Sequence, residues 1–146
     1  MNRHKAVRIV LMLGLALASI GRLTVPPAVS DPVPSEVHIN EKRNGATVRM
    51  TAGQLLVLTL PSNPSTGYSW DITGMNADLL KQYGPAETAQ RSSQPMPGEP
   101  GTITYRFRAI GAGSDTLQLS YWRSFEPPSI PAIQEYRIRV RIQPRQ

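Results

Sequence analysis

The chain has 146 residues, of which 16 are basic and 10 acidic, so its formal net charge is +6, and it contains no cysteine. This length allows one domain with a core large enough to fold without disulfides. The absence of cysteine excludes a thiol nucleophile, a disulfide framework, thiolate metal sites and a lipid anchor carried on cysteine.

The first 30 residues are typical of a secretory signal peptide. Three basic residues precede an apolar run over residues 9–20, which is shorter than the roughly 20 residues of a membrane-spanning helix. The small residues at 28–30 (AVS) predict cleavage before Asp31, while residues 16–18 (ALA) offer a second site. An uncleaved membrane anchor remains the alternative. We expect an exported protein, either periplasmic or secreted.

Cleavage changes the charge argument. Removal of residues 1–30 leaves 12 basic against 10 acidic residues, and a net charge near +2 gives no bulk argument for nucleic acid binding. Residues 31–35 contain two prolines and read as an extended spacer. We then expect one domain over residues 36–142 and a short C-terminal tail over residues 143–146.

Apolar residues alternate with polar ones along almost all of the domain, which is typical of half-buried strands. The sequence therefore predicts an all-β, immunoglobulin-like antiparallel β-sandwich of about seven strands without a disulfide. The inward-facing positions are Val37, Ile39, Leu56, Leu58, Leu60, Tyr68, Trp70, Ile72, Ile103, Tyr105, Phe107, Leu117, Leu119, Tyr121, Tyr136, Ile138, Val140 and Ile142.

Some segments interrupt the alternation. Residues 76–83 (NADLLKQY) fit two turns of helix or, alternatively, a short strand. Residues 44–46 (NGA) predict a tight hairpin turn between short strands, and the glycines of residues 111–114 mark a second turn.

Two charged features have an ordinary structural interpretation. Arg137, Arg139 and Arg141 occupy the solvent side of a strand, where arginine supports solubility and discourages edge pairing; an electrostatic contact surface is the alternative. His38, the one histidine left after cleavage, lies opposite Val37 and Ile39 on a strand surface.

The sequence gives no support for catalysis. No Ser/His/Asp set can be built around His38, and the acidic residues are scattered singly. We therefore expect neither an enzyme nor a metal or cofactor site.

The unusual composition lies in three connections. Residues 62–70 (SNPSTGYSW), 92–102 (SSQPMPGEPGT) and 122–133 (WRSFEPPSIPAI) are rich in proline, glycine and hydroxyl side chains. They fall after every second strand, so an antiparallel sandwich would bring all three to one end. In the first loop Pro64 restricts the backbone and Gly67 permits a positive φ, which would hold the hydroxyls of Ser65 and Thr66 at the apex. Stiff loops lose little entropy on binding, so we expect a binding tip.

These loops resemble the motifs of the chagasin family, the exported inhibitors of papain-like cysteine peptidases. NPSTGYSW is similar to the family's NPTTGY/F-x-W, PGEPGT to GxGG, and YWRSFE to YxRPW/F, in the family's order, over about residues 36–142. The resemblance implies an immunoglobulin-like sandwich that inhibits papain-like peptidases reversibly by inserting three loops into the active-site cleft. We expect the protein to be a monomer.

The resemblance also implies which residues contact the peptidase. Ser65 and Thr66 would lie nearest the catalytic thiolate, and the glycines of the second loop would let its backbone pair with the enzyme. The aromatic of the third loop would pack on an apolar wall. The implied contacts are Asn63, Pro64, Ser65, Thr66, Gly67, Tyr68, Gly98, Gly101, Arg123 and Phe125.

Four positions depart from the family motifs. Pro100 stands where glycine is usual, Ser124 replaces proline, Phe125 stands where tryptophan is common, and Ser65 replaces threonine. These departures bear on affinity and target choice. The remaining alternatives are a carbohydrate-binding sandwich that stacks sugars on Tyr68, Trp122 and Phe125, and a structural accessory domain with stiff loops.

Overall fold

The computed structural model of the protein describes residues 35–94 and 96–146. They belong to one compact unit, Pro32–Gln146. The expected signal peptide over residues 1–30 lies outside the described residues, as does the spacer over residues 31–35 except for Ser35. In the described part of the chain, no helix is long and apolar enough to cross a membrane.

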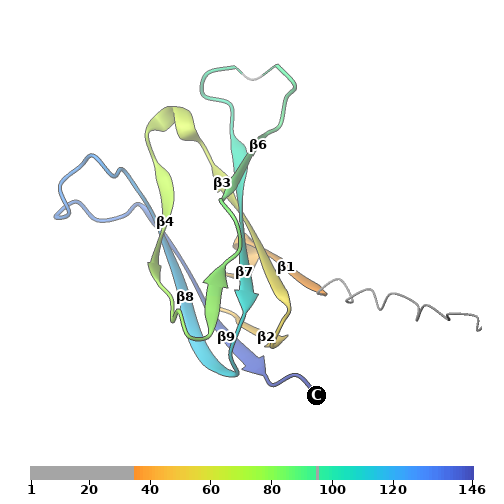
Figure 1. The fold of residues 1–146 in the computed structure, drawn as a ribbon. Helices are drawn as coiled ribbons and strands as arrows, with labels where there is room; N and C mark the ends of the chain where they lie inside the picture. The colour runs from red at the N-terminus through yellow and green to blue at the C-terminus, as the bar shows by residue number, and fades with distance from the viewer. Residues whose placement is uncertain (1–34, 95) are drawn as a thin grey trace, which may run out of the picture. The chain divides into compact units, whose positions relative to one another are not determined.

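The described residues form nine strands in two sheets that pack face to face (Figure 1). The first sheet has the order β1 (Glu36–Asn40), β3 (Leu55–Ser62), β7 (Gly101–Ala109), β5 (Leu80–Gln82), and β6 (Glu87–Gln90) also pairs with β7. The second sheet has the order β2 (Thr47–Thr51), β9 (Gln134–Gln143), β8 (Gly113–Trp122), β4 (Ser69–Gly74). Short 3-10 turns, η1 (Glu41–Arg43) and η2 (Pro64–Thr66), follow β1 and β3.

The core fills the space between the two sheets, and the predicted immunoglobulin-like sandwich is confirmed. On β9 the burial pattern alternates strictly, with Ile138 and Val140 fully buried between exposed arginines. Trp70 on β4 is only 5% exposed and packs its ring against Tyr121 on β8, with 4.9 Å between centroids. The predicted inward positions form most of this core, because side chains of period two reach one face of a strand.

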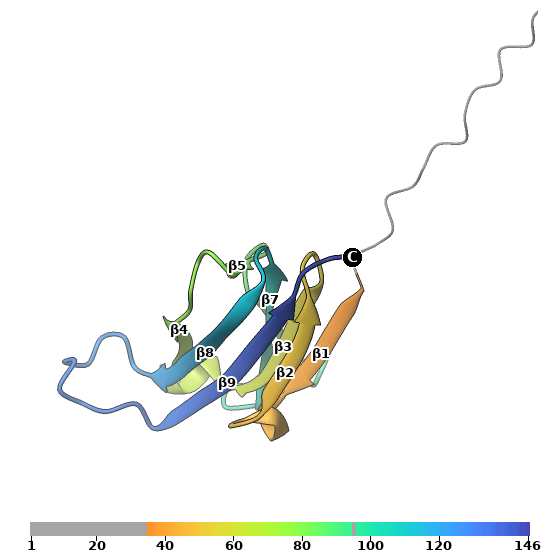
Figure 2. The ribbon, with the colours of Figure 1, turned by 90° about the horizontal axis from the view of Figure 1, so that it is seen from below.

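Two strand pairs correct the expectation of an all-antiparallel sandwich. β1 runs parallel to β3, and β2 runs parallel to β9. The Asn44–Gly45–Ala46 segment is therefore not a hairpin turn: it carries the chain from one sheet to the other. Its backbone is held on β9, where Gly45 N–H donates to the Arg137 carbonyl and Arg139 N–H donates to the Ala46 carbonyl. β1 belongs to the first sheet and β2 to the second, and Figure 2 shows β2 next to β9, the strand with which it pairs.

The described residues form nine strands where about seven were expected, and residues 76–83 do not form a helix. Of that stretch, Leu80–Gln82 forms the short strand β5, as the alternative interpretation held. β6 was not predicted, because all four of its residues are exposed and give no alternating pattern. Both short strands extend the first sheet beyond β7.

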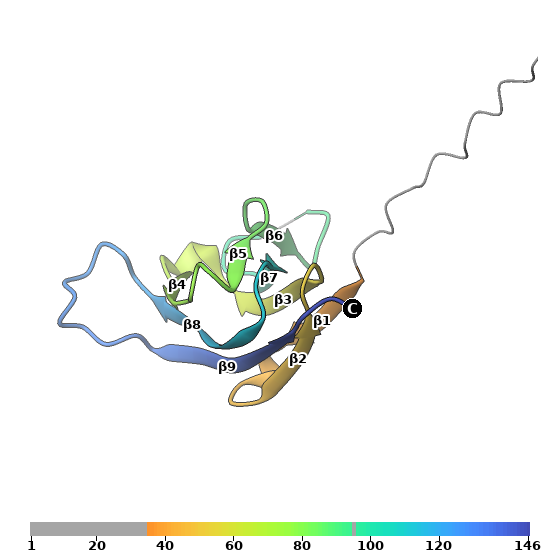
Figure 3. The ribbon, with the colours of Figure 1, turned by 60° about the horizontal axis from the view of Figure 1, so that its bottom comes forward.

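The charged side chains that the sequence placed on strand surfaces are exposed, but the expected role of the arginines in protecting a strand edge is not supported. His38 is exposed and pairs with the Glu36 carboxylate at 2.9 Å. Arg137, Arg139 and Arg141 are exposed on β9. However, β9 lies between β2 and β8 (Figure 3), so these arginines do not protect an edge strand.

Candidate functional site

Three loops meet at one end of the sandwich (Figure 1), and we call them together the three-loop tip. The first loop (residues 63–68) joins β3 to β4, the second (residues 91–100) joins β6 to β7, and the third (residues 123–133) joins β8 to β9. The expected clustering is observed. It arises because each loop continues a strand that points towards the same end, and the loops are then connected by side-chain hydrogen bonds.

Asn63 organises the first loop. Its backbone N–H donates to the Tyr121 hydroxyl at 3.1 Å, which fixes the loop to β8. Its side-chain amide donates to the Gly98 carbonyl at 3.1 Å, which connects the first loop to the second. The indole Nε1 of Trp70 donates to the Pro61 carbonyl at 2.8 Å and closes the base of the loop. The loop is therefore rigid before it meets any partner.

The hydroxyls at the apex point their protons inward. Ser65 Oγ donates to the Asn63 side-chain oxygen at 2.6 Å, and Thr66 Oγ1 donates to the Asn63 carbonyl at 2.7 Å. Both residues are exposed, as expected. Since each hydroxyl has used its one proton, it offers only lone pairs to an incoming group. The two hydroxyl side chains at the apex therefore present hydrogen-bond acceptors.

Gly67 ends the η2 turn in the left-handed conformation, with φ +77°. This bears out the expected positive φ. A Cβ here would lie 3.1 Å from Cε1 of Phe125, so the phenyl ring of the third loop covers this point. Phe125 is otherwise 72% exposed.

Arg123 joins the third loop to the first. Its Nε donates to the Thr66 carbonyl at 3.2 Å, and its guanidinium lies 4.4 Å from the centroid of the Tyr68 ring. The same guanidinium forms an ion pair with Glu126 at 3.1 Å. The resemblance implied that Arg123 contacts a peptidase; the structure gives it a positioning role between two loops.

The second loop turns at Gly98, where φ is +87°, and a Cβ added there would meet open space. Glu99 N–H donates to the Met96 carbonyl at 3.0 Å and closes the turn. Met96 is 74% exposed, so the loop presents an apolar side chain beside the first loop. Pro100 follows the turn and leads into β7.

Gly101, which the resemblance implied as a contact residue, is buried where the second loop ends. Its contact with a peptidase stays a prediction. Gly101 is the first residue of β7, paired with Ser62 of β3 on one side and Gln90 of β6 on the other. A Cβ at this position would collide with the backbone carbonyl oxygen of Ala89. Glycine is required here because it lets β6 approach β7.

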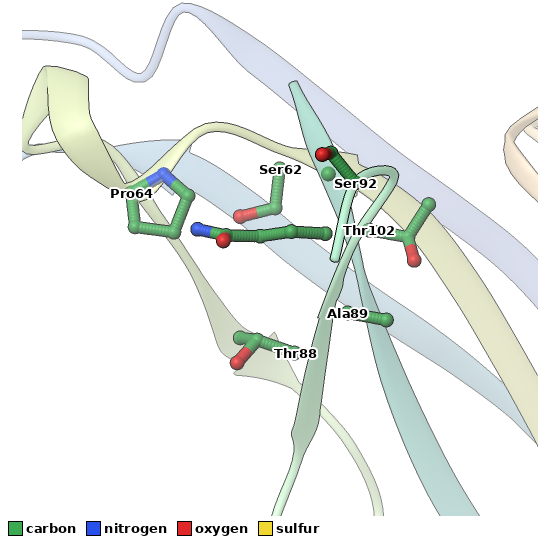
Figure 4. A pocket seen from close by; sticks show the side chains of 8 residues that line it. Ser62, Pro64, Thr88, Ala89, Ser92 and Thr102 are labelled. Atoms are coloured by element: carbon green, nitrogen blue, oxygen red, sulfur yellow. The ribbon is translucent and has the colours of Figure 1, made fainter. Parts of the chain in front are cut away.

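Two shallow depressions separate the first loop from the second. One, of about 280 Å³, lies between the ends of β3, β6 and β7 (Figure 4). Its lining is polar or small: Ser62, Pro64, Thr88, Ala89, Gln90, Ser92, Gly101 and Thr102. The other, of about 240 Å³, lies between Asn63 to Ser65 and the turn from Met96 to Glu99. In the described part of the chain no cluster of three His, Cys, Asp or Glu side chains could hold a metal ion.

The three aromatics considered for sugar stacking do not form one platform. One face of Tyr68 is covered by Arg123, and its ring lies 5.5 Å from that of Tyr121. Trp122 lies on the outer face of the second sheet, where its Nε1 donates to the Asp71 carboxylate at 2.5 Å. Of the three, Phe125 alone is largely exposed.

The tip contains residues that the motifs did not single out. Glu126 is one, and its signal was the spacing of three from Arg123, which suits an ion pair across a turn. Met96 is another, an isolated apolar residue among prolines and polar residues.

Below the tip, Tyr105 Oη donates to the Trp70 carbonyl at 2.5 Å. Burial of the phenol, followed by the charge of Asp71, raises the pKa of Tyr105.

Comparison with known proteins agrees with this geometry. Residues 49–140 match the model of the chagasin family peptidase inhibitor I42. Chagasin of Trypanosoma cruzi is 27% identical over 99 residues, which cover 62% of this chain and 84% of that protein. Amoebiasin-2 of Entamoeba histolytica is 28% identical over 102 residues, covering 65% and 77%.

Solved structures show the same fold. The crystal structure of the cysteine protease inhibitor EhICP2 from Entamoeba histolytica superposes with a TM-score of 0.66 at 24% identity, covering 77% of this chain and all of that one. The solution structure of Amebosin gives a TM-score of 0.61 at 22% identity, covering 76% and 100%. The family match spans most of the sandwich and reaches all three loops, so the chain belongs to the chagasin family of peptidase inhibitors and is an inhibitor rather than an enzyme.

Proposed function

We propose that this protein inhibits papain-family cysteine peptidases reversibly and without a covalent bond, by filling the active-site cleft with the three-loop tip. The observation that carries the proposal is the connection of all three loops through Asn63 and Arg123. Because these loops are fixed in the free protein, binding costs little conformational entropy. The similar structure EhICP2, whose title describes it as a cysteine protease inhibitor, supports the same target class.

The first loop suits a cleft that contains a thiolate and an imidazolium. Such pairs form when a histidine takes the proton of the cysteine. The lone pairs of the Ser65 and Thr66 hydroxyls can accept from the imidazolium N–H. The η2 turn at the apex is coiled, whereas a cleavable peptide has to lie extended along the cleft. The loop can therefore block the nucleophile without becoming a substrate.

The other two loops would contact the walls of the cleft. Met96 and the backbone around Gly98 form the exposed part of the second loop, while Phe125 forms that of the third. Exposed apolar side chains on stiff loops are typical of interface anchors. Pro100 removes one backbone donor from the second loop, so we expect fewer backbone hydrogen bonds there.

Titration of purified residues 31–146 against papain, with a small fluorogenic substrate, tests the proposal. We expect saturable, reversible and competitive inhibition at sub-micromolar concentration. No inhibition of papain or of cathepsin-type relatives at tens of micromolar, by a folded domain, would contradict it.

A negative charge placed at the apex should weaken inhibition of the peptidase. Thr66→Asp removes the hydroxyl proton and adds a negative charge facing the thiolate, so we expect inhibition to weaken by at least about tenfold. Thr47→Asp is the matched control, since Thr47 is exposed on β2 away from the tip. Equal weakening by both variants would contradict an apex contact.

We also propose that the protein is exported, periplasmic or secreted, and acts as a monomer. The basis for export is the charged start and short apolar run of residues 1–30. N-terminal sequencing of the mature protein from the exported fraction should begin at Asp31 or at Ser19, according to which site is cleaved. An intact N-terminus in a membrane fraction would contradict the proposal.

A further inference from the structure

Four arginines gather on the outer face of the second sheet, away from the three-loop tip. Arg49 comes from β2, and Arg137, Arg139 and Arg141 come from β9, and all four are exposed. β2 and β9 are neighbours (Figures 2 and 3). We call this surface the arginine face.

The arginines of the arginine face have fewer side-chain partners than the two arginines on the outer face of the first sheet. On the other sheet, Arg106 forms an ion pair with Glu87 at 2.8 Å, and Arg108 stacks on the Tyr83 ring at 4.7 Å. On the arginine face only Arg137 has a carboxylate within reach, that of Glu135 at the limiting distance of 4.0 Å. The other three arginines have no ion pair among the described residues.

The register makes this arrangement unfavourable in the free protein. Arg49 stands directly opposite Arg141 on adjacent strands, which lie about 4.8 Å apart. Like charges opposite each other destabilise a sheet. Protection of an edge does not explain the β9 arginines, because β9 is paired on both sides. An anionic partner would remove this repulsion.

Neutral hydrogen-bonding groups stand between the arginines. Thr47 and Thr116 flank Arg139 across the sheet, and Ser114 lies opposite Arg141. Hydroxyls next to guanidinium groups suit a ligand that carries both charges and hydroxyls. An aromatic side chain for stacking nucleic acid bases is missing between these positions, and so is an exposed apolar side chain for insertion into a bilayer.

We propose that the arginine face binds an anionic polysaccharide, whose carboxylate or sulfate groups pair with the guanidinium groups and whose hydroxyls bond to the threonines and Ser114. Guanidinium recognises such planar or multi-oxygen anions with paired hydrogen bonds. Arg141 pairs with residues next to the β7–β8 turn, at the end opposite the third loop. The polymer and a peptidase can thus bind at the same time.

Heparin serves as the probe, with neutral dextran as the blank, using the domain of residues 31–146, which contains the whole compact unit Pro32–Gln146. The test variant combines Arg49→Gln, Arg139→Gln and Arg141→Gln. The matched control removes three exposed charges outside the face through Arg43→Gln, Lys81→Gln and Arg145→Gln. Calorimetric titration at two salt concentrations should show roughly tenfold weaker binding of heparin by the test variant. Each exposed ion pair contributes little alone, so the three substitutions are combined to give a measurable loss. The control should stay within about twofold of the unmodified domain.

Equal weakening of both variants would overturn the proposal, since net charge alone would then explain the binding. Equal affinity of the arginine face for a single-stranded oligonucleotide or for anionic phospholipid vesicles would overturn the choice of a polysaccharide. Urea unfolding should show that both variants are folded. Inhibition of papain by the test variant should be unchanged. Heparin binding therefore tests the arginine face, and papain inhibition tests the three-loop tip.

Discussion

Gly67 ties the shape of the first loop to the position of Phe125. Its φ of +77° is unfavourable for a residue with a side chain, and an added Cβ would press on the phenyl ring. Gly67→Ala should cost about 1–2 kcal/mol of folding stability and weaken inhibition by more than about tenfold, because both loops move. Urea unfolding and inhibition titrations measure the two effects.

Gly84 supplies the control for that substitution. It has nearly the same φ, +76°, but lies between β5 and β6, where an added Cβ would meet nothing within 4 Å. Gly84→Ala should therefore cost similar stability without changing inhibition. If both substitutions reduced inhibition equally, the effect would come from backbone strain in general and not from the tip.

Arg123 acts on the tip through its geometry and not only through its charge. Lysine keeps the charge but cannot donate from Nε to the Thr66 carbonyl while stacking on Tyr68. We expect Arg123→Lys to weaken inhibition by roughly tenfold and to reduce stability by less than about 1 kcal/mol, since the group is partly exposed. Amide chemical shifts of Thr66 and Gly67 should move in the variant. Unchanged shifts with reduced inhibition would instead indicate direct contact with the peptidase.

At the scale of elements, β6 depends on a glycine in its neighbour. Gly101→Ala would drive a methyl group into the Ala89 carbonyl, and neither backbone can move without losing the β6–β7 ladder. We expect a loss of about 1–3 kcal/mol in unfolding free energy and faster hydrogen exchange of the β6 amides. Gly98→Ala is the control: it strains the backbone, where φ is +87°, but its added Cβ meets open space, so the β6 amides should keep their protection. Protection of β6 that survives in Gly101→Ala would contradict this role.

The long strands could be predicted from the sequence, but their pairing could not. Alternation on β9 identifies which face is buried, since each inward residue removes apolar surface from water. The parallel partners of β1 and β2 depend on which sheet each strand joins, and the local pattern carries no such information. β6 is exposed throughout and is defined only by hydrogen bonds to β7.

At the scale of the whole molecule, the location of the tip could be predicted from the sequence. The hydrogen bonds that connect its loops could not. The motif NPSTGY indicates the loop, and proline and glycine fix its turn locally. The Asn63–Gly98 and Arg123–Thr66 bonds join residues 35 and 57 positions apart. Only the assembled sandwich brings such pairs together, which is why the motifs did not reveal these bonds or the packing of Gly101 against β6.

The two sheets are also connected by Tyr136. From β9 its hydroxyl donates to the carbonyl of Asn40 at the end of β1, at 3.0 Å. Its side chain is 2% exposed. Burial raises the pKa of Tyr136 from 10.0 to about 12, with Arg43 acting in the opposite direction and Glu41 adding to the rise. The neutral phenol is thus the form that the folded sandwich holds.

This pKa predicts loss of stability in alkali. Below pH 10 the phenol is neutral in the folded and in the unfolded chain, so its contribution to the unfolding free energy is fully present. Between pH 10 and about 12 the phenol ionises only in the unfolded chain, and the unfolding free energy therefore falls with rising pH. The whole effect is roughly 2–3 kcal/mol. Tyr136→Phe should lower stability at pH 8 by about 1 kcal/mol through the lost hydrogen bond, yet flatten the alkaline decline. Urea unfolding at intervals from pH 8 to above pH 11 measures both, and an equally steep decline in the variant would mean that another group controls the transition.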